Sequence, residues 1–168
     1  MASVTLKGNP VQLAGTMPAT GAAAPDFTLV KQDLSAVAKK DFAGKTLILL
    51  TVPSLDTATC ALETKKFNEK AAALPGVTVL VASADLPFAI KRFCAAEGIT
   101  NVHGVSDLRD REFGKRWGVA IADGVLQGLT VRAAFVIDAA GVVKYVELVP
   151  EIASEPDYDA ILAAAAKA

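Results

Sequence analysis

The sequence predicts an α/β protein in which helices flank a central mixed sheet, with a β-hairpin at the N-terminus. Two apolar runs, residues 45–52 and 77–82, favour β-structure and have no polar face, as expected of central strands that are covered on both sides. A segment with helical character follows each of these runs. Two more strand-like runs near the C-terminus are joined only by Ala139-Ala140-Gly141, which predicts a second hairpin.

The N-terminal hairpin is indicated by two short runs of alternating residues. Residues 4–6 and 11–13 alternate polar and apolar side chains, and the turn cluster Gly8-Asn9-Pro10 separates them. Residues 15–25 are rich in Gly, Ala and Pro, which predicts an extended connection along the surface. A strand is expected next, at residues 27–30.

Two helices are expected after the two central strands. The first should run from about residue 57 to residue 74, where Pro75-Gly76 stops it. The second should be capped by Asp85, carry Pro87 in its first turn, where proline is tolerated, and end near Gly98. Because crossovers between parallel strands are right-handed, the first helix is expected to cover one face of the sheet.

The remaining elements complete the sheet and its helical layers. They are expected in this order: a short strand at 102–105, a charged helix at 110–117, strands at 133–138 and 142–149, and an alanine-rich helix at 156–168. This order predicts helices on both faces of the sheet. No repeat or linker interrupts the chain, so residues 1–168 are expected to form a single domain.

The composition argues against nucleic acid and membrane partners. The 17 basic and 18 acidic side chains give a net charge of −1 without a Lys/Arg run, so binding to a phosphate backbone is not expected. The longest strongly apolar stretch, residues 47–52, is far too short to cross a bilayer. The first residues lack the layout of a secretory signal, and we therefore expect a soluble, cytoplasmic protein.

The chain has two cysteines, Cys60 and Cys94, and one histidine, His103. These residues do not supply the four ligands of a structural zinc site, and no C-x-x-C motif is present. In a small cytoplasmic protein, two distant cysteines are more often buried and inert than functional. Only the local context of each cysteine can therefore argue for a role.

Cys60 lies in the first turn of the helix expected from residue 57, which is an activating position for a thiol. The thiolate is the nucleophile, whereas a free thiol with a pKa of about 8.5 is mostly protonated at neutral pH. Unpaired backbone N–H groups and the helix dipole favour an anion in a first turn. Thr57, three residues earlier, faces the same side, where its hydroxyl can donate to the sulfur or to a small oxygen-containing substrate, or can simply cap the helix. Cys94 lies toward the end of its own helix, where the dipole disfavours an anion, which suggests a later reactant.

The residues around Cys60 resemble the active-site signature of the peroxiredoxins. The match is the spacing Pro53-x3-Thr57-x2-Cys60. Four further segments resemble one branch of that family, the bacterial thiol peroxidases: residues 83–89, 92–98, 118–124 and 155–158. The similarity extends over nearly the whole chain and includes the N-terminal hairpin.

The resemblance implies a thioredoxin-like fold and the reduction of hydrogen peroxide and alkyl hydroperoxides. It implies that Cys60 is the peroxidatic cysteine and Cys94 the resolving cysteine. Pro53, Thr57 and Arg132 would then form the peroxide pocket, with Arg132 favouring the thiolate and orienting the peroxide oxygens. The two cysteines would form an intramolecular disulfide that thioredoxin reduces. No metal or organic cofactor is needed, and the resembled branch commonly forms homodimers.

Two alternative functions remain open at this point. A general thiol–disulfide exchange protein would also use a reactive thiol, although it would normally carry C-x-x-C. A non-catalytic interaction module would hold both cysteines as inert core residues. The peroxidase carries a structural requirement of its own, because a disulfide needs Cα atoms within about 7 Å and intact separate helices often hold cysteines further apart. We therefore predict that one or both helix ends partly unwind during turnover.

Overall fold

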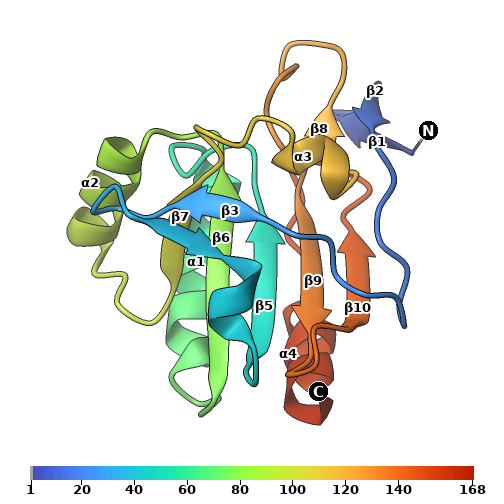
Figure 1. The fold of residues 1–168 in the computed structure, drawn as a ribbon. Coiled ribbons are helices and arrows are strands. Elements are labelled where there is room, and N and C mark those ends of the chain that lie inside the picture. Colours follow the sequence, from blue (N-terminus) through green and yellow to red (C-terminus); the bar gives the residue numbers. More distant parts are fainter. Residues whose placement is uncertain (1) are drawn as a thin grey trace.

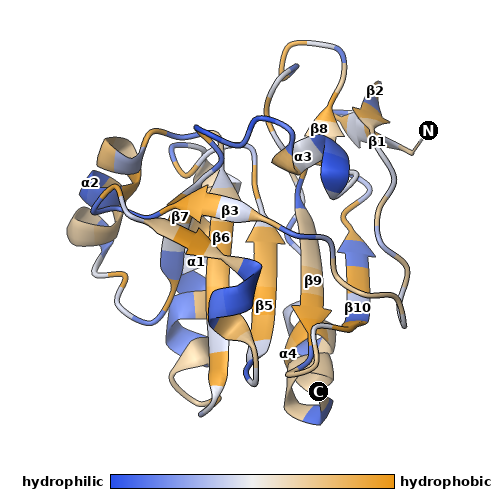
Figure 2. Ribbon diagram, viewed as in Figure 1, coloured by the Kyte–Doolittle hydropathy of each residue, from blue (hydrophilic) through white to orange (hydrophobic). Residues whose placement is uncertain are grey.

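A mixed seven-stranded sheet forms the centre of the protein, as predicted, in the computed structural model, which describes residues 2–168. In spatial order its strands are β10 (Val143–Leu148), β9 (Ala133–Ile137), β5 (Thr46–Thr51), β6 (Val77–Ser83), β7 (His103–Ser106), β3 (Thr28–Val30) and β4 (Ala36–Ala38). The inner strands β5, β6 and β7 are parallel to one another, and the outer pairings are antiparallel (Figure 1). The two runs expected as central strands are β5 and β6, and both are hydrophobic along most of their length (Figure 2).

Helices cover both faces of this sheet, but the three longest share one face. The helices are α1 (Ala58–Ala71), α2 (Pro87–Glu97), α3 (Phe113–Arg116) and α4 (Tyr158–Lys167), with a 3-10 helix η1 at Lys39–Phe42. Phe67 of α1, Ile90 of α2 and Ile161 of α4 pack in one core with alternate residues of the sheet, such as Ile48. The opposite core contains α3 and the N-terminal hairpin (Figure 1). Because successive strand residues point to opposite faces, each central strand contributes to both cores.

The N-terminal hairpin is present, with β1 at Ser3–Leu6 and β2 at Asn9–Ala14. Its turn is tighter than expected, because Lys7 and Gly8 form it with positive φ values of 50° and 80° and Asn9 already lies in the strand. Two residues with positive φ are typical of the turn whose twist matches a hairpin. A short strand that we did not predict, β8 (Ala120–Ile121), pairs with β2 and completes a small second sheet.

One expected helix cap is wrong. Leu86, and not Asp85, is the N-cap residue of α2, and no side chain caps this helix. The carboxylate of Asp85 instead accepts hydrogen bonds from the Ser54 hydroxyl at 2.6 Å and from the Leu55 N–H at 2.8 Å. Asp85 thus connects the loop before α2 to the loop before α1.

Glu151 fastens the N-terminal hairpin to the loop that follows β10. Its carboxylate accepts hydrogen bonds from the Thr5 hydroxyl at 2.7 Å and from the backbone N–H groups of Lys7 at 2.9 Å and Gly8 at 3.1 Å. Successive N–H groups in a turn of this kind form a concave site for an anion. These hydrogen bonds lower the pKa of the Glu151 carboxyl from 4.5 to about 2.

The lowered pKa predicts how Glu151 affects stability in acid. A carboxyl group whose pKa is lower in the folded state stabilises the fold above its unfolded pKa, and this contribution disappears as the pH falls through the folded pKa. The free energy of unfolding of wild type should therefore exceed that of Glu151→Gln at neutral pH, and the gap should narrow between about pH 4.5 and about pH 2. Urea unfolding of both proteins at pH 7 and pH 3 tests this prediction, and an equal gap at the two pH values would contradict it.

No helix within residues 2–168 is long and apolar enough to span a membrane.

Candidate active site

The loop between β5 and α1 places Cys60 in the interior of the protein. β5 ends at Thr51, α1 begins at Ala58, and the Cys60 side chain, in the first turn of α1, is fully buried. Thr57 is the N-cap residue, but its side chain caps no backbone N–H group. Its hydroxyl donates to the Ser54 carbonyl at 2.9 Å. In this arrangement the Thr57 oxygen is left to accept a hydrogen bond from a ligand, and the expected role of Thr57 as a donor stays a prediction.

The sheet brings Arg132 to this loop from a distant part of the sequence. In the antiparallel pairing of β5 with β9, Thr51 lies opposite Ala133. Arg132, one residue before Ala133, is therefore level with Val52, where the chain leaves the sheet toward α1. Pairing register alone thus places a guanidinium beside the start of the helix that carries Cys60.

Arg132 contacts the sulfur directly. Its Nη2 atom lies 3.3 Å from Cys60 Sγ, and its side chain is almost fully buried. Nε and Nη2 both donate to the Ile152 carbonyl, at 3.1 and 3.0 Å, which fixes the plane of the guanidinium. Burial disfavours the charge of Arg132, but Glu63 and Cys60 outweigh this effect and raise its pKa. The sulfur therefore has a permanent cation as its neighbour.

Glu63 completes the buried charge cluster, and it was not among the predicted site residues. It lies one turn after Cys60 in α1, is about 1% exposed and forms an ion pair with Arg132 Nη1. Burial raises the pKa of its carboxyl to about 7, while the Arg132 charge acts in the opposite direction. Its Oε1 atom has no hydrogen-bond partner among the described residues. An acidic residue three positions after Cys60, on the same face of the helix, was the sequence signal that could have identified it.

A small, mostly apolar pocket of about 220 Å³ opens beside Arg132 and the start of α1. Its lining comprises Leu6, Pro53, Thr57, Ala58, Thr59, Leu126, Leu129, Arg132, Ile152 and Ala153. Three of the predicted site residues, Pro53, Thr57 and Arg132, thus line one cavity, and Cys60 lies behind it in contact with Arg132. Leu6 comes from the N-terminal hairpin, so the segment that Glu151 fastens also forms a wall of the pocket.

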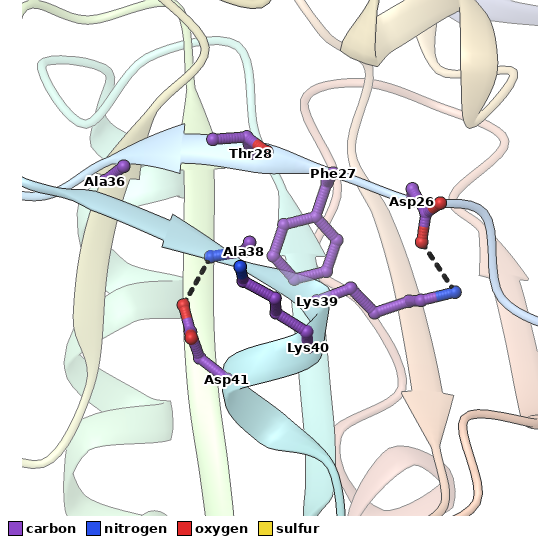
Figure 3. A pocket seen from close by; sticks show the side chains of 8 residues that line it. All are labelled: Asp26, Phe27, Thr28, Ala36, Ala38, Lys39, Lys40 and Asp41. Carbon is purple, nitrogen blue, oxygen red and sulfur yellow. Dashed lines mark hydrogen bonds and ion pairs between the residues drawn. The ribbon is translucent and has the colours of Figure 1, made fainter.

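A larger cavity of about 690 Å³ lies on β3, β4 and η1, where Phe27 contributes to the opposite core (Figure 3). Its charged groups are largely paired, because Lys39 contacts Asp26 at 2.8 Å and Asp41 accepts from the Ala38 N–H at 2.8 Å (Figure 3). It contains no cysteine. The smaller pocket beside the sulfur is therefore the candidate active site.

Cys94 is the one predicted site residue that lies apart from the others. It is buried in α2, where the Gln32 amide donates to its sulfur at 3.5 Å and burial raises the pKa of the thiol. Its sulfur lies against Gly104 of β7, whereas the contact of Cys60 is with Arg132, beside the start of β9. β5 and β6 separate β7 from β9. β7 and β9 are therefore three strand spacings apart, which is roughly 14 Å. Both thiols are free.

Comparison with known proteins identifies the family of this chain. The Redoxin family model matches residues 19–162. The chain belongs to the Redoxin family. Thiol peroxidases of Leptospira interrogans and Mycobacterium tuberculosis are 59% and 52% identical to it, and each alignment covers 98% of both chains.

Solved structures agree with this membership. A peroxiredoxin-like protein from Aquifex aeolicus is 45% identical, with a TM-score of 0.93 over 99% of this chain and 97% of that one. A thiol peroxidase from Chromobacterium violaceum is 28% identical, with a TM-score of 0.89 over 96% and 93% of the two chains. These matches confirm the predicted peroxiredoxin resemblance and the thioredoxin-like fold. They also confirm that this Redoxin protein is a thiol-dependent peroxidase.

Proposed function

We propose that Cys60 is the peroxidatic thiol of this peroxidase and that it reduces hydrogen peroxide and alkyl hydroperoxides. The observation that carries the proposal is the contact between Cys60 Sγ and the Arg132 guanidinium at 3.3 Å, behind a pocket lined by Pro53 and Thr57. A cation and a helix N-terminus together favour the thiolate that a nucleophilic attack requires.

In the first step the Cys60 thiolate attacks the terminal oxygen of the hydroperoxide. The O–O bond breaks, the sulfur becomes a sulfenic acid, and the departing oxygen takes up a proton and leaves as water or an alcohol. Arg132 stabilises the negative charge that develops on the oxygens, because its donors are already fixed by Ile152 and Glu63. Thr57 accepts the peroxide O–H and orients the substrate, and Pro53 shields the sulfur from bulk water.

In the second step the Cys94 thiolate attacks the Cys60 sulfenic acid, releases water after protonation and forms the intramolecular disulfide. A thioredoxin-type reductant then restores both thiols by thiol–disulfide exchange. The raised pKa of the buried Cys94 thiol suits a group that reacts only after it becomes exposed. No metal or organic cofactor takes part in either step.

The pocket walls favour substrates with an apolar tail. Leu6, Leu126, Leu129 and Ile152 line the cavity next to Arg132. An alkyl group would bury apolar surface there while the hydroperoxide reaches the guanidinium. We therefore include alkyl hydroperoxides as well as hydrogen peroxide among the substrates.

We further propose that residues 1–168 act as a single domain, that the protein works as a homodimer, and that it is located in the cytoplasm. The cytoplasm keeps thiols reduced, which a cycle through free Cys60 and Cys94 requires. Leu86 and Phe88, at the start of α2, are 52% and 65% exposed and would suit a contact between two copies.

The function is tested by an assay that couples peroxide reduction to thioredoxin and its reductase. Wild type should turn over both hydrogen peroxide and an alkyl hydroperoxide. Cys94→Ser should still consume one equivalent of peroxide, because Cys60 is intact, but its turnover with thioredoxin should fall by about tenfold or more, since the disulfide that thioredoxin reduces no longer forms. Absence of wild-type turnover with every peroxide would refute the function, and unchanged turnover of Cys94→Ser would refute the resolving role.

A further inference from the structure

Asp85 joins the two loops that precede the cysteine-bearing helices. Its Oδ1 atom accepts from the Ser54 hydroxyl at 2.6 Å. Its Oδ2 atom accepts from the Leu55 N–H and from the Ser83 hydroxyl, both at 2.8 Å. Ser54 and Leu55 lie in the loop before α1, and Ser83 ends β6 just before α2. One carboxylate thus bridges segments about 30 residues apart in the sequence.

The hydrogen bonds of Asp85 extend to the first turn of α1. The carbonyl of Ser54 accepts both the backbone N–H of Thr57 at 3.1 Å and its hydroxyl at 2.9 Å. Leu55 is buried in the same core as Cys60 and Cys94. Fixing Ser54 and Leu55 therefore fixes the N-cap residue that lines the pocket and the turn that contains Cys60.

Asp85 is itself anchored to the sheet. The Ser106 hydroxyl, at the end of β7, donates to the backbone carbonyl of Asp85 at 2.6 Å. The only ion pair that the structure describes between this loop and α2 is Asp56 with Arg92, which is long, at 3.9 Å, and largely exposed. Such a surface pair contributes little, so the carboxylate of Asp85 is the principal polar link between the loop and the start of α2.

The disulfide step needs a rearrangement, and movement of the start of α1 would break this link. Cys60 contacts the guanidinium of Arg132, which directly precedes β9, and Cys94 lies against Gly104 of β7; these two strands are roughly 14 Å apart, whereas a disulfide needs Cα atoms within about 7 Å. We expect Cys60 to leave Arg132 and the start of α1 to move with it. The hydrogen bonds from Ser54 and Leu55 to Asp85 exist only while that turn is in place.

We propose that Asp85 is a positioning residue that holds the loop before α1 in the arrangement that reacts with peroxide and releases it before Cys60 joins Cys94. This inference rests on the proposed function. It assigns to Asp85 the balance between the oxidation of Cys60 and the formation of the disulfide. Weakening the link should slow the oxidation of Cys60, because Thr57 and Cys60 are less well placed. It should also speed disulfide formation, because the start of α1 opens more readily.

Asp85→Asn tests the proposal, because the amide keeps the shape of the side chain but replaces one acceptor oxygen with a donor. Loss of about one hydrogen bond to a charged group corresponds to roughly a tenfold change. Rapid mixing with hydrogen peroxide should show Cys60 oxidation slowed and disulfide formation accelerated, each by about tenfold. The fraction of Cys60 driven to sulfinic acid by excess peroxide should fall, because the sulfenic acid persists for less time.

Two further variants make the test decisive. Ser54→Ala removes one of the two hydrogen bonds from the loop to Asp85 and should shift both steps in the same directions, even if Asp85→Asn does not fold. Asp138→Asn is the matched control, because the carboxylate of Asp138 also accepts hydrogen bonds within a loop, from the backbone N–H groups of Ala140 and Val142, but in the distant turn before β10. It should leave both rates unchanged.

The outcomes distinguish failure of this proposal from failure of the proposed function on which it rests. If both steps slow together in Asp85→Asn and Ser54→Ala, Asp85 has only a structural role and the proposal is wrong. Rates equal to those of Asp138→Asn would also overturn it. If wild type forms no disulfide between Cys60 and Cys94, the proposed function itself fails, and the release step fails with it.

Discussion

Cys60→Ser should lose peroxide reduction almost completely, with the rate falling by about 10⁴-fold or more, as expected when the nucleophile of an enzyme is removed. A serine hydroxyl is far less acidic than a thiol and cannot form a sulfenic acid. The substitution leaves the pocket intact, because serine fits the fully buried site of Cys60 and can still accept a hydrogen bond from Arg132. The measurement is the loss of hydrogen peroxide with time in the presence of thioredoxin.

Cys94→Ser is the matched control for this experiment, since it makes the same chemical change at the other buried thiol. It should retain the first oxidation at the wild-type rate. If Cys60→Ser still consumed peroxide, the assignment of the peroxidatic cysteine would be wrong. If Cys60→Ser retained thiol–disulfide exchange with thioredoxin but not peroxide reduction, exchange would reside in Cys94 alone.

Arg132→Lys should slow the oxidation of Cys60 by about 100-fold, the usual cost of losing an oriented donor to developing negative charge. Lysine keeps the positive charge that Glu63 needs in this buried site, so the fold is expected to persist. A single ammonium group cannot reproduce the forked contacts that Arg132 makes with Cys60, Glu63 and Ile152. The rate constant of Cys60 oxidation, measured by rapid mixing over a range of peroxide concentrations, tests this prediction.

Glu63→Gln separates the role of Arg132 from the role of its buried partner. The amide can still accept a hydrogen bond from Arg132 Nη1, so the guanidinium should stay near the sulfur. We expect a smaller loss, of about tenfold or less, in the oxidation of Cys60. A loss in Glu63→Gln as large as that in Arg132→Lys would mean that the intact ion pair, and not the donors of Arg132, governs the reaction.

Long apolar segments of the sequence predicted most of the fold correctly. β5 and β6 are buried on both faces, so a continuous apolar run identified each of them. β8 has two residues and pairs with β2, which is distant in the sequence. β4 pairs with the neighbouring β3, but its three residues are too few to show a pattern. Asp85 shows the same limit, because a residue suited to a helix cap bonds instead to a loop 30 residues away.

The candidate site was predictable only where its residues are neighbours in the sequence. Pro53, Thr57 and Cys60 share one loop and one helix turn, so their spacing revealed them. Arg132 came from the family resemblance alone, because the register of β5 against β9 is what brings it to the sulfur. In the sequence, Glu63 resembles an ordinary acidic residue of a helix. Its burial depends on its ion pair with Arg132, which the sheet brings close to it.

The most direct test of the account is to map the disulfide formed by one equivalent of hydrogen peroxide. Trypsin should release Cys60 in the peptide 46–65 and Cys94 in the peptide 93–109. We predict that, without reduction, these two peptides are joined and that the intact chain is lighter by about 2 Da, because two hydrogens are lost when two thiols become a disulfide. An unmodified Cys60 peptide, or a bond that joins two chains instead of Cys60 to Cys94 of one chain, would contradict it.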